Sequence, residues 1–197
     1  MCLGLVFVLT GAFAQQEKGD AKILEIKLDR ANMPSEVRGQ STIQELNQDW
    51  YQVEVKFSTE LDVPEVQVKF YVEAVEDLFA PEAKEKKNEK ERAYLVLTGE
   101  QTYLNVPRGR EHYAAMYLDP MSLIRYGGKD GARGFRQMNV HVQVFMGSEL
   151  ASEKDMRKDD EGWFDTGQQI SGVLIGLKDS PWWPSMARRY NRVKGNN

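Results

Sequence analysis

A strict alternation of apolar and polar residues constrains the fold of this chain more than any other feature of its sequence. The clearest case runs from Tyr51 to Ser58, where every second residue is apolar. The pattern resumes after Val63-Pro64, from Val66 to Val72. A period of two is typical of a β-strand with one buried face. Because the connection between the two runs is short, we expect them to pair as an antiparallel hairpin.

Further strands are predicted where β-rich runs are bounded by Gly, Pro, Asp or Ser. These runs are Lys22 to Asp29, Ala93 to Leu97, Gln101 to Val106, His112 to Leu118, Met138 to Met146 and Gly172 to Leu177. In the first run the apolar set is Leu24, Ile26 and Leu28. Many short strands without amphipathic helices predict an all-β fold, an immunoglobulin-like antiparallel β-sandwich with Greek-key connections. We place the sandwich at residues 22–180.

The N-terminal segment has the features of an export signal. It is continuously apolar from Cys2 to Leu9, and Ala12-Phe13-Ala14 has the small-x-small form of a signal-peptidase site. We predict a signal peptide at 1–14 and a flexible tail at 15–21. The usual Lys or Arg at the start of a signal peptide is missing, which leaves the start codon open, and a buried first strand is the alternative. The run is shorter than the roughly 20 residues that a membrane-spanning helix needs, so no stable membrane span is predicted.

Composition restricts the class of protein further. The length of 197 residues suits one domain, and a net charge of -4 is too weak a field to recruit nucleic acid. The single cysteine, Cys2, would leave with the signal peptide, so we expect no disulfide. The stability of the exported chain must then come from its core.

Three polar segments are candidates for either sites or loops. Pro81 to Arg92 mixes acidic and basic residues and is predicted to be a solvated insertion, either helical or disordered. The acidic stretch Asp155 to Asp165 could offer oxygen ligands to calcium, but it lacks the EF-hand spacing and contains two cations, which favours a charged hairpin loop. The glycine-rich run Gly127 to Gly134 lacks the phosphate-binding motifs and is predicted to be a surface turn.

The two histidines are the only candidates for a catalytic base near neutral pH. His141 alternates with valines, which predicts a place on the outward face of its strand, and His112 begins another strand. Surface or hydrogen-bonded histidines are the simpler interpretation of both. With so few N and S ligands, we predict no catalytic residues, no metal site and no cofactor.

The C-terminal segment 181–197 concentrates aromatic and cationic residues. It carries four basic residues and no acidic one. Trp, Tyr and Arg are the residues that most often anchor interfaces. The predicted binding residues are Trp182, Trp183, Arg188, Arg189, Tyr190 and Arg192. The alternative is that the two tryptophans fold back and cap one end of the sandwich, with the arginines paired to acidic groups of the body.

Three phrases of the sequence carry a family resemblance. They are Trp50 to Phe57, Leu97-Thr98-Gly99-Glu100 with Asn105 to Gly109, and Ser180-Pro181-Trp182-Trp183 followed by Arg189-Tyr190. Together they resemble a family of exported bacterial proteins with an immunoglobulin-like fold, one member of which is encoded with a type IV pilus gene cluster in a mucin-degrading gut bacterium. The resemblance implies a secreted or outer-envelope component that works alongside pili. The chain departs from true pilins, which keep a long apolar helix for filament assembly.

These observations lead to one main hypothesis and two alternatives. The main hypothesis is a non-catalytic interaction protein, periplasmic, outer-envelope associated or secreted, that docks to envelope or pilus proteins or to a host protein or glycan. The first alternative is a carbohydrate-binding module that uses Trp182, Trp183 and Trp163 or Tyr190 as an aromatic platform. The second is a hydrolase with converging carboxylates, which no motif supports.

Overall fold

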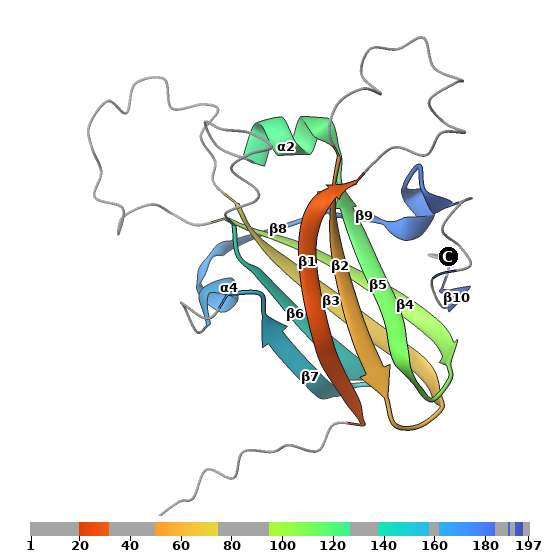
Figure 1. Ribbon diagram of the computed structural model, residues 1–197. Coiled ribbons are helices and arrows are strands. Elements are labelled where there is room, and N and C mark those ends of the chain that lie inside the picture. The colour runs from red at the N-terminus through yellow and green to blue at the C-terminus, as the bar shows by residue number, and fades with distance from the viewer. Residues whose placement is uncertain are drawn as a thin grey trace, which may run out of the picture.

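The computed structural model describes residues 20–31, 50–74, 95–126, 138–157, 162–183, 189 and 192–194, which form two packed β-sheets (Figure 1). The first sheet has the order β1-β2-β5-β9. The second has the order β10-β4-β3-β6-β7, and β8 lies parallel to β4. The strands are β1 (Ala21–Ala31), β2 (Trp50–Thr59), β3 (Val63–Ala74), β4 (Leu95–Val106), β5 (Gly109–Leu118), β6 (Val140–Met146), β7 (Glu149–Asp155), β8 (Gln168–Ser171), β9 (Ile175–Gly176) and β10 (Arg192–Val193). The helical elements are α2 (Pro120–Tyr126), α4 (Trp163–Thr166) and the 3-10 helix η4 (Leu177–Asp179).

The core lies between the two sheets, as the alternating pattern requires. Every second residue of β2 from Tyr51 to Phe57 is fully buried, and so is every second residue of β3 from Val66 to Val72. Each such side chain contributes about 1.5–3 kcal/mol through the removal of apolar surface from water. The prediction of an all-β sandwich is therefore confirmed.

The predicted hairpin between the second and third strands is wrong. β2 pairs with β1 and β5, whereas β3 pairs with β4 and β6 in the other sheet. The short turn after Thr59 carries the chain across the sandwich, so the buried faces of β2 and β3 oppose each other instead of sharing one sheet. β5 then returns beside β2, and β6 returns beside β3. These returns are Greek-key connections.

A β-bulge changes the buried set of β1. The pairing register with β2 shifts between Ile23 and Glu25. Ile23 and Ile26 are buried as a result, while Leu24, which we had expected to face the core, is 38% exposed. An extra residue at a bulge reverses the face to which the following side chains point, so simple alternation assigned Leu24 to the wrong side.

Several boundaries also differ from expectation. β4 is one continuous strand through Gly99, where two separate strands were expected. A Cβ at Gly99 would lie 2.6 Å from Met116 Sδ of β5, so the strand has no room for a larger residue there. β7 was not predicted, since its sequence is mostly polar, as suits an edge strand. The helix α2 was also missed. Its first turn is capped by the Asp119 carboxylate, which accepts hydrogen bonds from the N–H groups of Met121 and Ser122.

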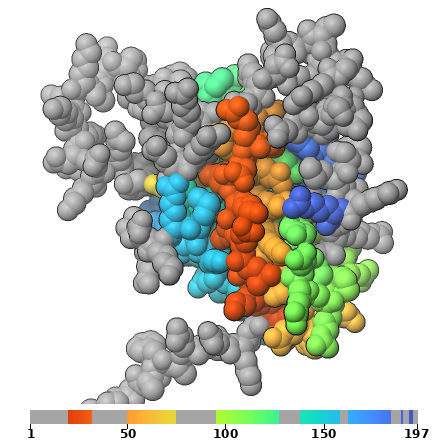
Figure 2. Space-filling model, in the orientation of Figure 1, coloured from red at the N-terminus to blue at the C-terminus, as the bar shows by residue number. Residues whose placement is uncertain are grey.

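One lateral edge of the sandwich is closed by β1 and β7, which lie side by side on the face shown in Figure 2. The Ile23 N–H donates to Ser152 Oγ at 3.1 Å, and Lys154 Nζ donates to the Leu24 carbonyl at 2.8 Å. These side-chain bonds occupy backbone groups that an edge strand would otherwise expose.

Some sequence predictions lie outside the described residues. They are the signal peptide at 1–14, the insertion from Pro81 to Arg92 and the glycine-rich run from Gly127 to Gly134. Of the predicted tail at 15–21, Asp20 is described as a bend and Ala21 is the first residue of β1.

Candidate interaction surface

At the edge of the sandwich opposite β1 and β7, the C-terminal part of the chain pairs first with one sheet, then with the other, and then with the first again. β8 runs along β4 as far as Thr98, and Gly172, at φ 80°, then turns the chain away. The chain next joins the other sheet, where β9 pairs with β5. Near the end of the chain β10 returns to β4 and pairs with Tyr103 and Leu104. The outer edge of β4 is thus paired at both ends, with β8 and with β10 (Figure 1), and no described residue pairs with it at Gly99, Glu100 or Gln101.

A groove of about 760 Å³ occupies this open stretch. We call it the edge groove. Its lining combines the apolar side chains of Met116, Leu174 and Ile175 and the buried amide of Gln101 with four charged residues, Glu100, Lys178, Asp179 and Lys194. The size lies within the range of about 300–1,000 Å³ that is typical of ligand sites.

Trp182, the first predicted binding residue, lies in the core. It is 1% exposed, stacks on Tyr117 with ring centroids 4.8 Å apart and meets Trp50 edge-on at 5.2 Å. This position agrees with the alternative in which the tryptophan caps the sandwich. A sugar platform would need its ring face, which Tyr117 covers. Trp183 is half-buried and packs against the same core.

Arg189 lies on the outer face of the first sheet. Its guanidinium donates to Glu54 Oε1 at 2.8 Å and lies over the Tyr113 ring, 4.4 Å from the centroid. Glu54 is far less exposed than Arg189, with side-chain exposures of 13% and 46%. The C-terminal segment is therefore attached to the acidic body at this point, and Arg189 still presents part of its cationic group to solvent.

The other predicted binding residues are only partly described. Arg188 and Tyr190 lie outside the described residues. For Arg192 only the backbone is described, and it pairs with Leu104 of β4. The neighbouring Lys194 donates from its backbone to the Thr102 carbonyl at 2.8 Å and from its side chain to Glu65 at 2.9 Å. Residues 192–194 are therefore bound to the second sheet, beside the edge groove.

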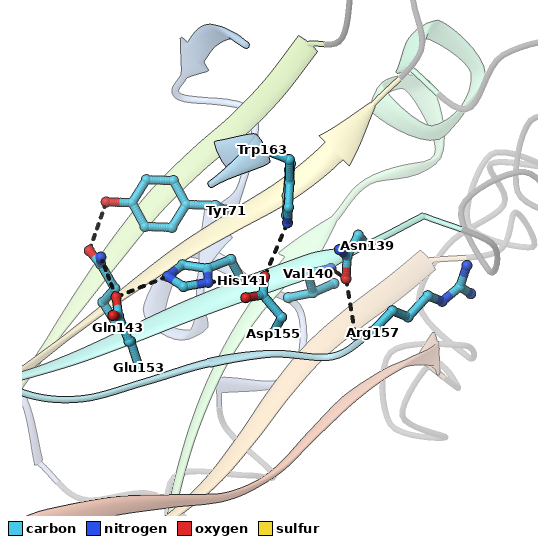
Figure 3. Close-up of polar contacts among 9 residues, drawn as sticks. All are labelled: Tyr71, Asn139, Val140, His141, Gln143, Glu153, Asp155, Arg157 and Trp163. Atoms are coloured by element: carbon cyan, nitrogen blue, oxygen red, sulfur yellow. Dashed lines mark hydrogen bonds and ion pairs between the residues drawn. The ribbon is translucent and has the colours of Figure 1, made fainter. Parts of the chain in front are cut away.

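His141 is buried, which corrects its predicted place on the surface. It does face away from the space between the sheets, but Phe164 of α4 stacks on its ring at 3.6 Å, and the residue is 3% exposed. Its Nδ1 lies 3.0 Å from Asp155 Oδ1, which also accepts from Trp163 Nε1 (Figure 3). Nε2 lies 3.5 Å from Glu153 and makes no hydrogen bond.

This histidine cluster joins β6, β7 and α4. The Asp155 carboxylate orients the imidazole, and Phe164 separates the ring from solvent. A general base must reach the proton that it abstracts from the substrate. The covered ring of His141 is instead arranged to hold α4 and β7 against β6.

His112 is also buried, on the inner side of β5. Its Nε2 lies 3.1 Å from Thr59 Oγ1, and that hydroxyl donates to the Pro107 carbonyl. Burial lowers the pKa of His112, against a smaller raising effect of the Pro107 carbonyl. A buried, uncharged histidine that connects two strands agrees with the hydrogen-bonded interpretation of this residue.

In the acidic stretch from Asp155 to Asp165, Asp155 ends β7 and Trp163 to Asp165 lie in α4, while the other described residues, 156–157 and 162, lie between these elements. Within the part of the chain that the structure describes, no group of three or more His, Cys, Asp or Glu residues could hold a metal ion. Over the same residues, no helix has the length and apolar character needed to cross a membrane.

The fold and the edge groove define the class of protein, an all-β sandwich with an interrupted edge strand. One protein-family model matches residues 12–197, almost the whole chain, and the chain belongs to the family that this model describes. A crystal structure from Akkermansia muciniphila matches with a TM-score of 0.65 and 19% identity, over 91% of this chain and 95% of that one. At this identity the structural match shows the fold alone. No curated protein matches the sequence.

Proposed function

We propose that this chain is a non-catalytic interaction protein of the bacterial envelope, an exported immunoglobulin-like sandwich that works alongside a type IV pilus or in surface adhesion. In this proposal residues 1–14 are removed on export, residues 22–180 form the sandwich, and residues 181–197 belong to its binding side. The family membership and the fold shared with an Akkermansia muciniphila protein support this assignment.

The interrupted edge of β4 is the observation that carries the proposal. A closed sandwich would pair or cover this edge along its whole length, because exposed backbone groups invite pairing with other chains. Here the two other segments of the same edge are paired, and the stretch between them opens into the edge groove. Such a place suits the binding of another protein.

The surroundings of the two histidines support a role without catalysis. Phe164 covers His141, and His112 lies inside the sandwich against Thr59. Neither imidazole is presented to a substrate in solution. The Trp/Arg segment supplies the second part of the proposed binding side, through Trp183 and the partly exposed guanidinium of Arg189.

Site-specific photo-crosslinking in bacterial cells that express the full chain tests the proposal. A photoreactive residue is placed at Lys178 in the groove lining, at Arg189, or at Arg110 as a matched control. Arg110 is an exposed cation on β5 that does not line the groove. We expect one or a few envelope proteins to be crosslinked from Lys178 or Arg189 and not from Arg110. Recovery of the chain alone from all three positions would refute the proposed function.

A glycan partner is tested separately. Intrinsic tryptophan fluorescence is measured during titration with mucin-type and plant glycans. A saturable change that Trp183→Ala abolishes would replace the protein partner by a carbohydrate. No response, together with specific protein crosslinks, supports the proposal as stated.

A further inference from the structure

We propose that the edge groove binds an extended peptide segment of the partner, which adds as a short strand beside Glu100 of β4. This inference deepens the proposed function, because it specifies the chemistry of the partner at the groove. The partner supplies backbone N–H and C=O groups in extended conformation, with an apolar side chain that points inward.

The hydrogen bonds along β4 show which way the backbone groups of Glu100 point. The N–H and C=O groups of successive strand residues point to opposite sides. The Thr102 carbonyl points outward, since it accepts from Lys194 N, and the pairing of Thr98 with β8 also lies on the outer side. Glu100, midway between them, must therefore point its N–H and C=O outward as well.

The neighbouring strand β3 confirms that the backbone groups of Glu100 point outward. Glu65 and Glu73 of β3 direct their backbone groups toward β6, as shown by the bonds from Gly147 N to the Glu65 carbonyl and from Glu73 N to the Asn139 carbonyl. Lys69 has the same parity as these residues and pairs with Glu100 across the β3–β4 ladder. Lys69 and Glu100 thus form a pair without mutual hydrogen bonds.

No strand of the described chain takes up the outward groups of Glu100. β8 ends its pairing at Thr98, and β10 begins at Tyr103. One donor and one acceptor of the main chain consequently face the edge groove. They have the spacing and direction that another strand would use, in line with β8 and β10.

The lining of the groove determines which side chain fits. In an added strand, the ligand side chains beside Gly99 and Gln101 point inward. Gly99 contributes no side chain, the buried Gln101 amide already accepts from Leu177 N, and the apolar part of the lining is Met116, Leu174 and Ile175. An apolar ligand residue of moderate size, such as valine, would bury its side chain there, and its neighbours would point outward to solvent.

The charges of the lining favour a peptide over a strongly charged ligand. Lys178 and Lys194 are balanced by Glu100 and Asp179. Lys194 is in addition bound to Glu65. A groove with no net charge gives no general attraction for polyanions, whereas its backbone donor and acceptor match an extended polypeptide.

The test uses a model peptide, N-acetylated and C-amidated Ser-Val-Ser-Val-Ser, and two-dimensional NMR of the full chain labelled with ¹⁵N. We expect saturable shifts of the amide signals of Gly99, Glu100 and Gln101, and slower hydrogen exchange at the Glu100 amide. The same peptide methylated at its backbone nitrogens cannot donate to a strand, and we expect it to bind at least about tenfold more weakly.

Two matched variants locate the contact. Glu100→Pro removes the outward N–H without taking a hydrogen bond from β3, and proline is tolerated at such edge positions. Glu100→Gln removes the charge and keeps the N–H. We expect Glu100→Gln to bind as the wild type does and Glu100→Pro to lose at least about tenfold in affinity.

Equal binding of the methylated and unmethylated peptides, or no shift at millimolar peptide, would overturn the inference. If Glu100→Pro fails to fold, as judged by near-UV circular dichroism, the methylated peptide decides alone. Crosslinking separates the two proposals. Partners that are captured from Lys178 equally well in the wild type and in a folded Glu100→Pro variant would leave the proposed function standing and remove the added strand.

Discussion

Replacement of Trp182 by alanine tests whether the C-terminal segment is part of the folded body. The side chain is 1% exposed, and its indole stacks on Tyr117 with an interplanar angle of 4° while Trp50 meets it edge-on. Removal of a buried tryptophan costs about 3–5 kcal/mol, through lost burial of apolar surface and the cavity left behind. Each aromatic pair contributes about 0.5–1.5 kcal/mol of interaction beyond its buried area.

We therefore expect Trp182→Ala to lower the free energy of unfolding by about 4 kcal/mol. For a chain of this size, that loss corresponds to a fall in Tm of about 8–16 °C. The assay is urea denaturation of the full chain, followed by far-UV circular dichroism and by tryptophan fluorescence, with equal transitions required of both probes.

Trp183→Ala is the matched control, because Trp183 is the adjacent tryptophan and is only half-buried. We expect it to cost about 1–2 kcal/mol, in proportion to its smaller buried area. A loss below about 1.5 kcal/mol for Trp182→Ala would fall well short of the usual cost of a buried tryptophan. That result, together with quenching of Trp182 fluorescence by iodide, would show that the ring is exposed in solution and would refute the argument from stacking.

Two further predictions concern the interior. Burial lowers the pKa of His112 below its ordinary 6.5, so the unfolded chain binds a proton before the folded one does as the pH falls. Stability should therefore decline as the pH drops from about 6.5 through the folded pKa, and His112→Gln should reduce that slope in denaturation curves between pH 7 and 5; an unchanged slope would contradict the assignment. Gly99→Ala would place a Cβ 2.6 Å from Met116 Sδ and 2.8 Å from Leu174 Cβ, and we expect a loss of about 1–3 kcal/mol in urea denaturation from this overpacking. Met116→Ala in the same chain should recover part of the loss, and strict additivity of the two changes would argue against the contact.

Much of the fold could be predicted from local pattern. The alternation in β2 and β3 determines which side chains each strand buries, because a side-chain period of two leaves only one apolar face. Pattern alone does not say which strands share a sheet. The turn after Thr59 is short enough for a hairpin, yet the chain uses it to cross the sandwich, and both strands still bury the same residues. Burial is satisfied in either arrangement, so the sequence could not distinguish them.

Features that depend on one extra residue or on a covering element were also beyond local pattern. The bulge at Ile23 reverses the face of Leu24, and α4 covers His141 on a strand face that alternation assigns to solvent. A polar edge strand such as β7 has little apolar signal of its own. Its position depends on the hydrogen bonds that it makes with β6 and on its contacts with Ile23 and Leu24.

The candidate site shows the same division. By itself the sequence determined that aromatic and cationic residues gather at the C-terminus, and that the strands bury alternate side chains. Only the tertiary structure decided that Trp182 lies against Tyr117, while Arg189 stays partly exposed beside Glu54. It alone also left Glu100 facing a groove between β8 and β10. Composition records which groups are present, but exposure and unsatisfied backbone groups depend on what distant segments cover.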